Sequence, residues 1–256
     1  MLFWHEVRNS ININLGYLRR VSHKSEEETM LLELKNIFKW VNSGGQRIFL
    51  LKDINLQIEE GEFISVMGPS GSGKSTLLNV IGMLDGFDEG EYNFLDESVH
   101  NLKEKHRANL YKEYIGFVFQ AYNLIPVLTA KENVEFIMQL QGKSKHERDS
   151  RSKELLEAVG IGDRANARPG KLSGGQQQRV AVARALASKP KFILADEPTA
   201  NLDSKSTETL LQIMEKLNRE ENITFIFSTH DARVVKKARR VITVEDGVIK
   251  EDKLNN

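Results

Sequence analysis

Short apolar runs of strand length alternate with stretches of helical periodicity from Leu31 onward. Such alternation is typical of a sheet flanked by helices, so the pattern predicts an α/β fold. A closing hairpin turn is expected at Asp246 and Gly247. The expected strands are residues 31–37, 51–58, 62–67, 116–119, 191–195, 224–228 and 240–244.

The middle of the chain has a different pattern. Between residues 102 and 171 the strand signal occurs only near Gly116, whereas residues 131–141 and 145–159 carry apolar positions at helical spacing. We therefore expect a helical subdomain, at about residues 102–171, inserted into the α/β core.

The first 29 residues lack a clean period. We expect residues 1–29 to be an N-terminal tail or a misassigned start, with Met30 as the alternative start, and residues 30–256 to form one domain. A tail that lies on a membrane surface, built on the apolar residues 2–4, is the alternative interpretation.

Charge and cysteine content limit the classes of function and of site that the chain can have. The 36 basic and 36 acidic side chains balance, which argues against a basic surface for nucleic acid over the whole molecule. Cysteine is absent, so disulfides and thiolate metal sites are excluded. Apolar runs are far shorter than the roughly 20 residues of a membrane span. A role at a membrane would require another chain as anchor.

A glycine-rich phosphate-loop pattern follows the expected strand 62–67 and precedes an apolar helix at residues 75–83. Backbone N–H groups and the helix N-terminus would bind phosphate oxygens, Lys74 would bridge the β- and γ-phosphates of ATP, and Ser75 would ligate Mg²⁺. The phosphate-binding residues that this pattern predicts are Gly68, Pro69, Ser70, Gly71, Ser72, Gly73, Lys74, Ser75 and Thr76.

Two carboxylates end the expected strand 191–195. Ligands bind at the C-terminal edge of a parallel sheet, where Asp196 and Glu197 would stand. We expect Asp196 to hold the Mg²⁺ shell and Glu197 to act as general base toward the attacking water.

A second glycine-containing helix start lies at residues 172–176. Ser173 is the expected N-cap of a helix from Gln176 to about Ala187, and Gly174 and Gly175 allow close backbone approach. These residues resemble the signature sequence of ABC transporter ATP-binding subunits. The resemblance implies that Ser173, Gly174, Gly175 and Gln176 contact the nucleotide of a partner subunit.

Further motifs of the ABC family appear in order. Gln120 resembles the Q-loop residue that senses Mg²⁺ or water, Asp203 the D-loop residue that contacts the partner, and His230 the switch histidine that contacts the γ-phosphate. The resemblance implies a P-loop NTPase core with an antiparallel β subdomain and an inserted α-helical subdomain. Lys74, Gln120, Glu197 and His230 are the expected catalytic residues.

One contact departs from the family pattern. The position that usually supplies an aromatic residue to stack on adenine falls on Val41, with Trp40 beside it. Trp40 is either the stacking residue or an aromatic side chain at a strand edge.

The wider sequence of residues 68–76, 81–85, 128–134 and 176–179 further resembles the lipoprotein-release and macrolide-export branch of the family. This implies an ATP-hydrolysing subunit that powers export or extraction through a separate integral membrane permease. ATP and Mg²⁺ are the implied cofactors, and a second copy of the chain and the permease are the implied partners. The implied location is the cytoplasmic face of the membrane, as a peripheral subunit, and no nucleic acid is expected as a partner.

Two alternatives carry the same catalytic motifs. One is a regulatory ABC ATPase that gates a cell-wall enzyme through a membrane partner. The other is a soluble ABC ATPase acting on nucleic acid or ribosomes, which usually has a coiled-coil insertion, a tandem cassette or a zinc module. The sequence shows none of these additions.

Overall fold

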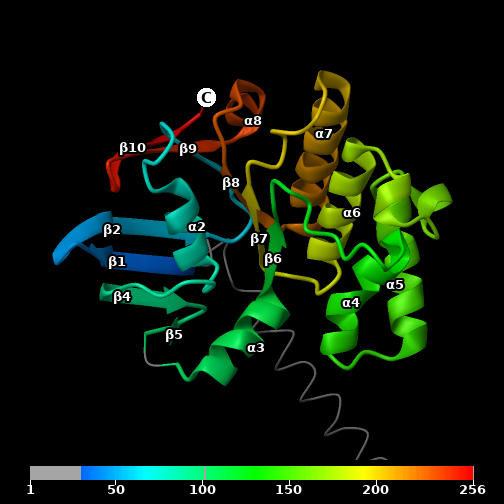
Figure 1. Ribbon diagram of the computed structural model, residues 1–256, viewed down its shortest axis with the longest axis horizontal. Helices are drawn as coiled ribbons and strands as arrows, with labels where there is room; N and C mark the ends of the chain where they lie inside the picture. Colours follow the sequence, from blue (N-terminus) through cyan, green and yellow to red (C-terminus); the bar gives the residue numbers. More distant parts are fainter. Residues whose placement is uncertain (1–29, 101, 256) are drawn as a thin grey trace, which may run out of the picture.

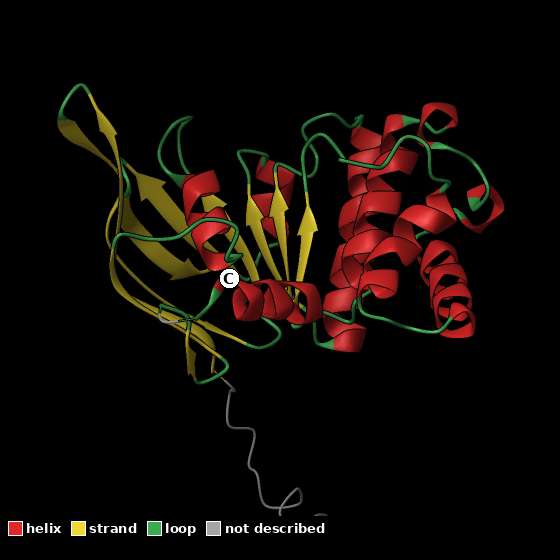
Figure 2. Cartoon of the chain, turned by 60° about the horizontal axis from the view of Figure 1, so that its bottom comes forward, coloured by secondary structure: helices red, strands yellow, loops and turns green. Residues whose placement is uncertain are grey.

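The computed structural model describes residues 30–100 and 102–255, which form two sheets and a group of helices (Figure 1). The expected tail at residues 1–29 lies outside this described part. Antiparallel strands occupy one end of the molecule and most helices the other, with the parallel strands between them (Figure 2). This arrangement confirms the predicted α/β core with an antiparallel sheet and helical parts.

The central sheet has six strands in the order β10-β9-β3-β8-β7-β6. Its strands are parallel except β10, which returns antiparallel to β9 through the expected turn at Asp246 and Gly247. The bounds are β3 Phe63–Met67, β6 Ile115–Val118, β7 Phe192–Asp196, β8 Thr224–Ser228, β9 Arg240–Glu245 and β10 Val248–Leu254.

The antiparallel sheet has the order β2-β1-β4-β5. Its first two strands form a hairpin that is longer than predicted, because pairing continues to Ser43 and Gln46 on either side of a glycine turn. Strands β4 and β5 were not predicted, since they are short and largely polar. The bounds are β1 Met30–Ser43, β2 Gln46–Glu59, β4 Glu89–Phe94 and β5 Glu97–Ser98.

The helices agree with the prediction where apolar spacing is strong. The two helices expected at residues 131–141 and 145–159 are α4 and α5, each begun by a capping box. Helices α3, α7 and α8 were not predicted. The bounds are α2 Lys74–Ile81, α3 Glu104–Tyr114, α4 Ala130–Leu140, α5 Lys145–Ala158, α6 Gly174–Leu186, α7 Ser204–Glu221 and α8 Ala232–Lys237, with 3₁₀ turns at Gly162–Arg164 and Pro169–Lys171.

Strand β6 lies within the range expected for the helical subdomain, yet it pairs with β7 at the edge of the central sheet. Helix α3 leads directly into β6. Helices α4 and α5, which both pack on α6, follow β6. The chain therefore returns to the sheet once before it enters the helical part.

Both faces of the central sheet are buried, which explains the unbroken apolar runs of its strands. In β8, Phe225 and Phe227 point toward the helices α6 and α7, while Ile226 packs with the antiparallel sheet and α2. Alternate residues thus fill two separate cores. Packing on both faces of the sheet fixes the strand ends on which the site is built.

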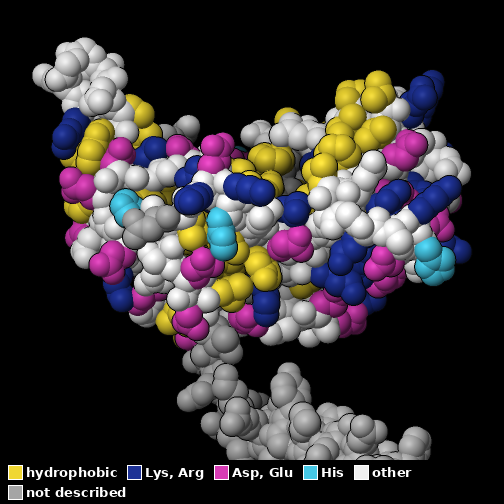
Figure 3. All heavy atoms as spheres, turned by 90° about the horizontal axis from the view of Figure 1, so that it is seen from below, with side chains coloured by type: hydrophobic (Ala, Val, Ile, Leu, Met, Phe, Trp, Pro, Cys, Tyr) yellow, Lys and Arg dark blue, Asp and Glu magenta, His cyan; other side chains and the backbone are white. Residues whose placement is uncertain are grey.

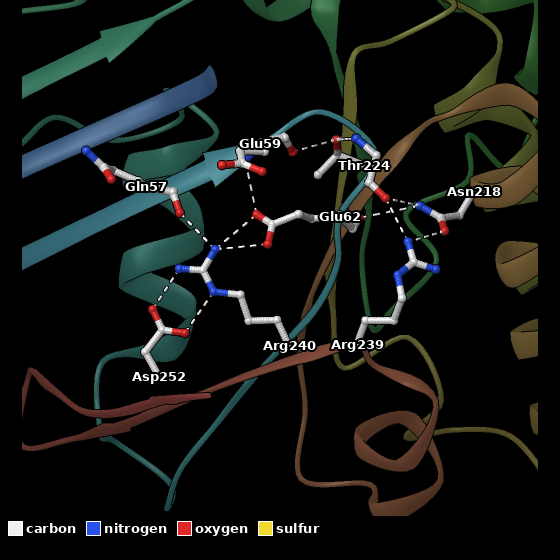
Figure 4. Close-up of polar contacts among 9 residues, drawn as sticks. Gln57, Glu59, Glu62, Asn218, Thr224, Arg239, Arg240 and Asp252 are labelled. Carbon is white, nitrogen blue, oxygen red and sulfur yellow. Dashed lines mark hydrogen bonds and ion pairs between the residues drawn. The ribbon is translucent and has the colours of Figure 1, made fainter. Parts of the chain in front are cut away.

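A polar cluster fixes the N-terminal edge of the central sheet (Figure 4). The Arg240 guanidinium, at the start of β9, donates to both carboxylate oxygens of Glu62 at 3.0 Å and to those of Asp252 at 2.8 and 2.7 Å. It also donates to the backbone oxygen of Gln57 at 2.9 Å. This cluster joins β2, β3, β9 and β10 at the edge opposite the phosphate loop.

Candidate functional site

The phosphate loop runs from the end of β3 to the start of α2, as the sequence predicts. Two of its glycines are required by close packing: a Cβ on Gly68, at φ 152°, would lie 2.0 Å from the Val244 carbonyl oxygen. A Cβ on Gly73, at φ 107°, would lie 2.8 Å from the Leu50 carbonyl oxygen. Side chains at these positions would push the loop away from β2 and β9.

The start of α2 is open to an anion. Gly73 is its N-cap, has no side chain and receives no side-chain hydrogen bond. The first N–H groups of a helix have no partner within the helix, and the helix dipole adds partial positive charge there. The loop therefore presents backbone donors to a phosphate group.

Lys74 folds back over the loop. Its Nζ donates to the carbonyl oxygens of Gly68 at 2.8 Å and Pro69 at 2.9 Å. Its neighbour Ser75 donates from Oγ to Asp196 Oδ1 at 3.2 Å, across to the end of β7. Two segments 121 residues apart thus meet at one point.

A pocket of about 540 Å³ opens beside the loop. Besides the loop, its walls come from β2 and from the turn between β9 and β10. The sequence analysis missed both contributions. The lining residues are Ile48, Phe49, Leu50, Lys52, Gly71, Gly73, Lys74, Ser75, Thr76, Asp246 and Gly247.

Trp40 lies next to Phe49, one of these lining residues. It pairs with Phe49 across the β1–β2 hairpin, and the two rings meet edge to face with centroids 5.6 Å apart. The Arg47 guanidinium lies 4.5 Å from the centre of the Trp40 ring. Phe49 lines the pocket and Trp40 does not. The apolar run of residues 48–51, which begins before the expected strand 51–58, could have indicated that this strand starts earlier.

Glu197 and His230 meet at the C-terminal ends of the neighbouring strands β7 and β8. Glu197 Oε1 lies 2.7 Å from His230 Nδ1, and its Oε2 accepts from Thr229 Oγ1 at 3.4 Å. The Glu197 side chain is 17% exposed and that of His230 is 75% exposed. Parallel pairing of β7 with β8 produces this approach, because both chains leave the sheet at the same edge.

Gln120 follows β6 at the same edge and is exposed. Its backbone oxygen accepts from Asn201 Nδ2 at 3.1 Å, in the segment that leads to Asp203. The next residues, Tyr122 and Asn123, have φ of 60° and 50°. Gln120 is thus linked by its backbone to the loop after β7.

The signature residues begin α6 at Gly174, two residues earlier than predicted. Ser173 is the N-cap, as expected: its Oγ accepts from the Gln176 backbone at 3.3 Å, and Gln176 Oε1 accepts from the Ser173 backbone at 2.8 Å. A Cβ on Gly175 would lie 2.7 Å from Ser206 Oγ, so α7 starts directly beside α6.

Asp203 is the N-cap of α7. It accepts from the backbone N–H of Ser206 at 2.9 Å and from the Ser206 hydroxyl at 2.8 Å. The backbone hydrogen bond from Ser206 lowers the pKa of the Asp203 carboxyl. Ser173 and Asp203 are both exposed, and neither is among the described residues that line the pocket.

A glycine-rich loop between a strand and a helix, facing a carboxylate pair at the end of a second parallel strand of the same sheet, defines a P-loop nucleoside triphosphatase. The family model for the ABC transporter matches residues 51–200. The chain belongs to this family, and it is an ATP-binding, ATP-hydrolysing subunit. The predicted family, fold and enzyme class are confirmed.

Relatives at high identity cover the same part of the chain. The ABC transporter ATP-binding protein MJ1508 of Methanocaldococcus jannaschii is 49% identical over 221 residues, which are 86% of this chain and 98% of that protein. The macrolide export ATP-binding/permease protein MacB of Wolinella succinogenes is 49% identical over 219 residues. That match covers 86% of this chain and 34% of MacB.

A solved structure has the same fold. The ATP-binding cassette MJ0796, in a dimeric post-hydrolysis state bound to ADP and phosphate, matches with a TM-score of 0.82 and 45% identity. The match covers 88% of this chain and 98% of that one. Neither a gating subunit nor an ATPase acting on nucleic acid is favoured by these similarities. Within residues 30–100 and 102–255, no helix has the length and apolar character to cross a membrane.

Proposed function

We propose that the chain is the ATP-driven motor of an exporter, in which two copies close on ATP and move a separate membrane permease. The observation that carries this proposal is the meeting of Lys74, Ser75, Asp196, Glu197 and His230 at one edge of the sheet, with the signature helix start exposed elsewhere. Residues 30–256 would form the whole motor domain.

ATP would bind with its phosphates in the loop of residues 68–76. Lys74 would exchange the two carbonyl oxygens it now contacts for phosphate oxygens, which form stronger, charge-assisted hydrogen bonds. The adenine ring would lie on the β1–β2 hairpin face, where Phe49 lines the pocket and Trp40 supports it.

Mg²⁺ fits the pair Ser75 and Asp196. Their oxygen atoms are hard ligands 3.2 Å apart, a donor set that Mg²⁺ prefers, and Gln120 follows the adjacent strand β6. Mg²⁺ would neutralise the phosphate charge. Ser75 and Asp196 would hold it between the loop and β7.

Glu197 would act as the general base and accept a proton from the attacking water. Its half-buried carboxylate comes directly after Asp196, the last residue of β7. His230 is mostly exposed, so its free ring edge would contact the γ-phosphate. The contact between the two side chains would orient the carboxylate. Gln120 would sense the metal or the water from the next strand end.

A second copy would complete the site. The starts of α6 and α7 lie side by side and carry Ser173 and Asp203 on the surface, outside the pocket of their own chain. MJ0796 is dimeric in its ADP-bound structure. We infer that the residues 173–176 and Asp203 contact the partner's nucleotide.

A permease would dock beside the loop that follows Gln120. Three large apolar side chains are exposed on this loop and on α4, the helix that follows it: Val127 at 71%, Phe136 at 40% and Leu140 at 56%. Exposed hydrophobic side chains are visible over the helical end of the molecule (Figure 3). An apolar surface of this kind marks a protein contact. The subunit would then lie on the cytoplasmic face of the membrane, and the MacB similarity favours export.

Glu197→Gln tests the motor directly. Loss of a general base typically lowers the rate by about 10²- to 10⁴-fold, while the phosphate contacts remain. The variant should bind ATP and accumulate as a dimer in size exclusion with ATP, and remain monomeric without it. Glu251→Gln, on the exposed strand β10, is the matched control and should behave like the wild type.

Lys74→Ala tests the phosphate-loop assignment. It should weaken ATP binding about 10- to 100-fold, because one charge-assisted contact is lost. Wild-type turnover in Glu197→Gln, or a monomer with ATP bound, would contradict the proposed roles. Wild-type affinity in Lys74→Ala would contradict the phosphate-loop assignment.

A further inference from the structure

A buried hydroxyl connects the two loops that carry Glu197 and His230. Thr199 lies two residues after Glu197 and is only 2% exposed. Its Oγ1 donates to Asp231 Oδ2 at 3.0 Å, and Asp231 is the residue after His230. The contact spans 32 residues of sequence and bridges the C-terminal ends of β7 and β8.

The backbone conformation of Glu197 requires support from neighbouring contacts. Its φ of 46° lies in the left-handed region, which costs a side-chain-bearing residue energy and persists only where neighbouring contacts enforce it. Two backbone bonds contribute: the Glu197 N–H donates to the Ser228 oxygen at 2.8 Å, and the Glu197 oxygen accepts from Ala200 at 3.2 Å. Thr199 adds a side-chain bond to the same turn.

Asp231 is itself held firmly as an acceptor. The Arg233 guanidinium donates to both of its oxygens, from Nε at 3.0 Å to Oδ1 and from Nη2 at 2.7 Å to Oδ2, and the Arg233 backbone donates to Oδ1 at 2.9 Å. The hydrogen bonds from Arg233 lower the pKa of the Asp231 carboxyl. Asp231 therefore offers Thr199 a fixed, charged acceptor.

The same loop reaches the Glu197 carboxylate from the other side. The Asp231 N–H donates to Thr229 Oγ1 at 3.0 Å, and that hydroxyl contacts Glu197 Oε2 at 3.4 Å. A closed ring thus runs from Glu197 along the backbone to Thr199, and from there through hydrogen bonds to Asp231, Thr229 and back to Glu197. Opening the ring at Thr199 would leave the turn free to relax.

We propose that Thr199 and Asp231 are positioning residues for ATP hydrolysis: their hydrogen bond holds the strained Glu197 turn against the His230 loop. The inference rests on the proposed role of Glu197 as general base. Neither residue touches the phosphate loop, so the bond supports turnover and leaves nucleotide binding unchanged. It sets the direction of the carboxylate toward the water and His230.

Thr199→Val removes the hydroxyl and keeps the shape, while Thr199→Ser keeps the hydroxyl. Misplacement of a catalytic group by about 1 Å can cost up to about 100-fold in rate. The Val variant should therefore lose about 10- to 100-fold in kcat, with KM for ATP and ATP affinity within about twofold of wild type. The Ser variant should recover most of the lost kcat.

Several results would overturn the inference. Wild-type kcat in Thr199→Val would do so, and so would parallel losses of kcat, ATP affinity and urea midpoint, which indicate a merely structural role. If the Val variant gives no folded protein, Thr199→Ala removes the same hydroxyl: lowered kcat with retained ATP affinity supports the inference, and wild-type kcat rejects it.

Glu197→Gln, assayed in the same way, distinguishes a failure of the positioning inference from a failure of the proposed role of Glu197. If it abolishes turnover while Thr199→Val turns over normally, only the positioning inference fails. If Glu197→Gln itself turns over normally, the proposed role of Glu197 fails, whatever Thr199 does.

Discussion

Arg184 Nη2 lies 2.9 Å from the backbone oxygen of Tyr122, 62 residues earlier in the chain, and its Nη1 donates to the next carbonyl, that of Asn123. Both acceptors sit in left-handed backbone, and burial lowers the pKa of the guanidinium. One planar side chain on the signature helix thus holds the loop that follows Gln120. A lysine ends in one ammonium nitrogen and does not reproduce the two separate N–H donors of this planar fork.

Arg184→Lys should therefore destabilise the fold by about 1–2 kcal/mol, since one hydrogen bond from a charged group is lost. ATP turnover should also fall, because the segment after Gln120 relaxes away from α6. Urea unfolding and steady-state hydrolysis measure the two effects. Arg219→Lys, on the exposed face of α7, is the control. An unchanged urea midpoint would show that the loop does not depend on the fork.

Ser173→Arg should leave ATP binding to the monomer intact and abolish ATP-driven dimerisation and turnover, because a large cation would block the partner's nucleotide. The substitution also removes an N-cap, which costs about 1 kcal/mol. Ser144→Arg is a matched control, since Ser144 caps α5 with the same capping box. Loss of turnover in both variants would point to capping alone.

Arg240→Met should lower the free energy of unfolding by about 2 kcal/mol, since it leaves Glu62 and Asp252 without their shared partner (Figure 4). Turnover per folded molecule should stay at the wild-type level, because the cluster lies at the sheet edge opposite the phosphate loop. A double-mutant cycle with Asp252→Asn measures the coupling. Additive effects would mean that the pair contributes nothing.

Asp231 gives a pH dependence. Arg233 lowers the pKa of this carboxyl in the folded chain. Its contribution to stability is therefore fully present above the unfolded pKa of about 3.9, and it is lost as the pH falls through the lower folded value. The stability difference between wild type and Asp231→Asn should be constant from about pH 5 to 8 and shrink below about pH 4. A difference that grows toward acid pH would reverse the assigned sign.

Residue identity at fixed spacing was enough to predict the phosphate loop and the acids of β7, because their chemistry requires those residue types in that order. The walls of the pocket were not predictable in this way. Phe49 lies in the apolar run of residues 48–51, and only its pairing with Trp40 in the β1–β2 hairpin places it at the pocket. Strand β4 was missed because it is short and largely polar.

Hydrogen bonds between the ends of neighbouring strands were not predicted, for a different reason. Thr199 and Asp231 each look like ordinary polar residues after a strand, and only the parallel register of β7 and β8 brings them within hydrogen-bonding distance. In contrast, α7 did carry a readable signal, since Leu210, Met214 and Leu217 recur at helical spacing behind an aspartate N-cap.

Gly247 supports the phosphate loop from far down the chain. Its N–H donates to the Ser72 oxygen at 2.9 Å, and its carbonyl accepts from Lys52 at 2.7 Å. During synthesis the loop emerges from the ribosome long before this support, at chain elongation rates of about 5–20 residues per second. A nascent chain thus carries the complete phosphate-loop sequence for many seconds before Gly247 is available to bind Ser72. We therefore expect firm nucleotide binding only once the β9–β10 hairpin has formed and Gly247 has bound Ser72.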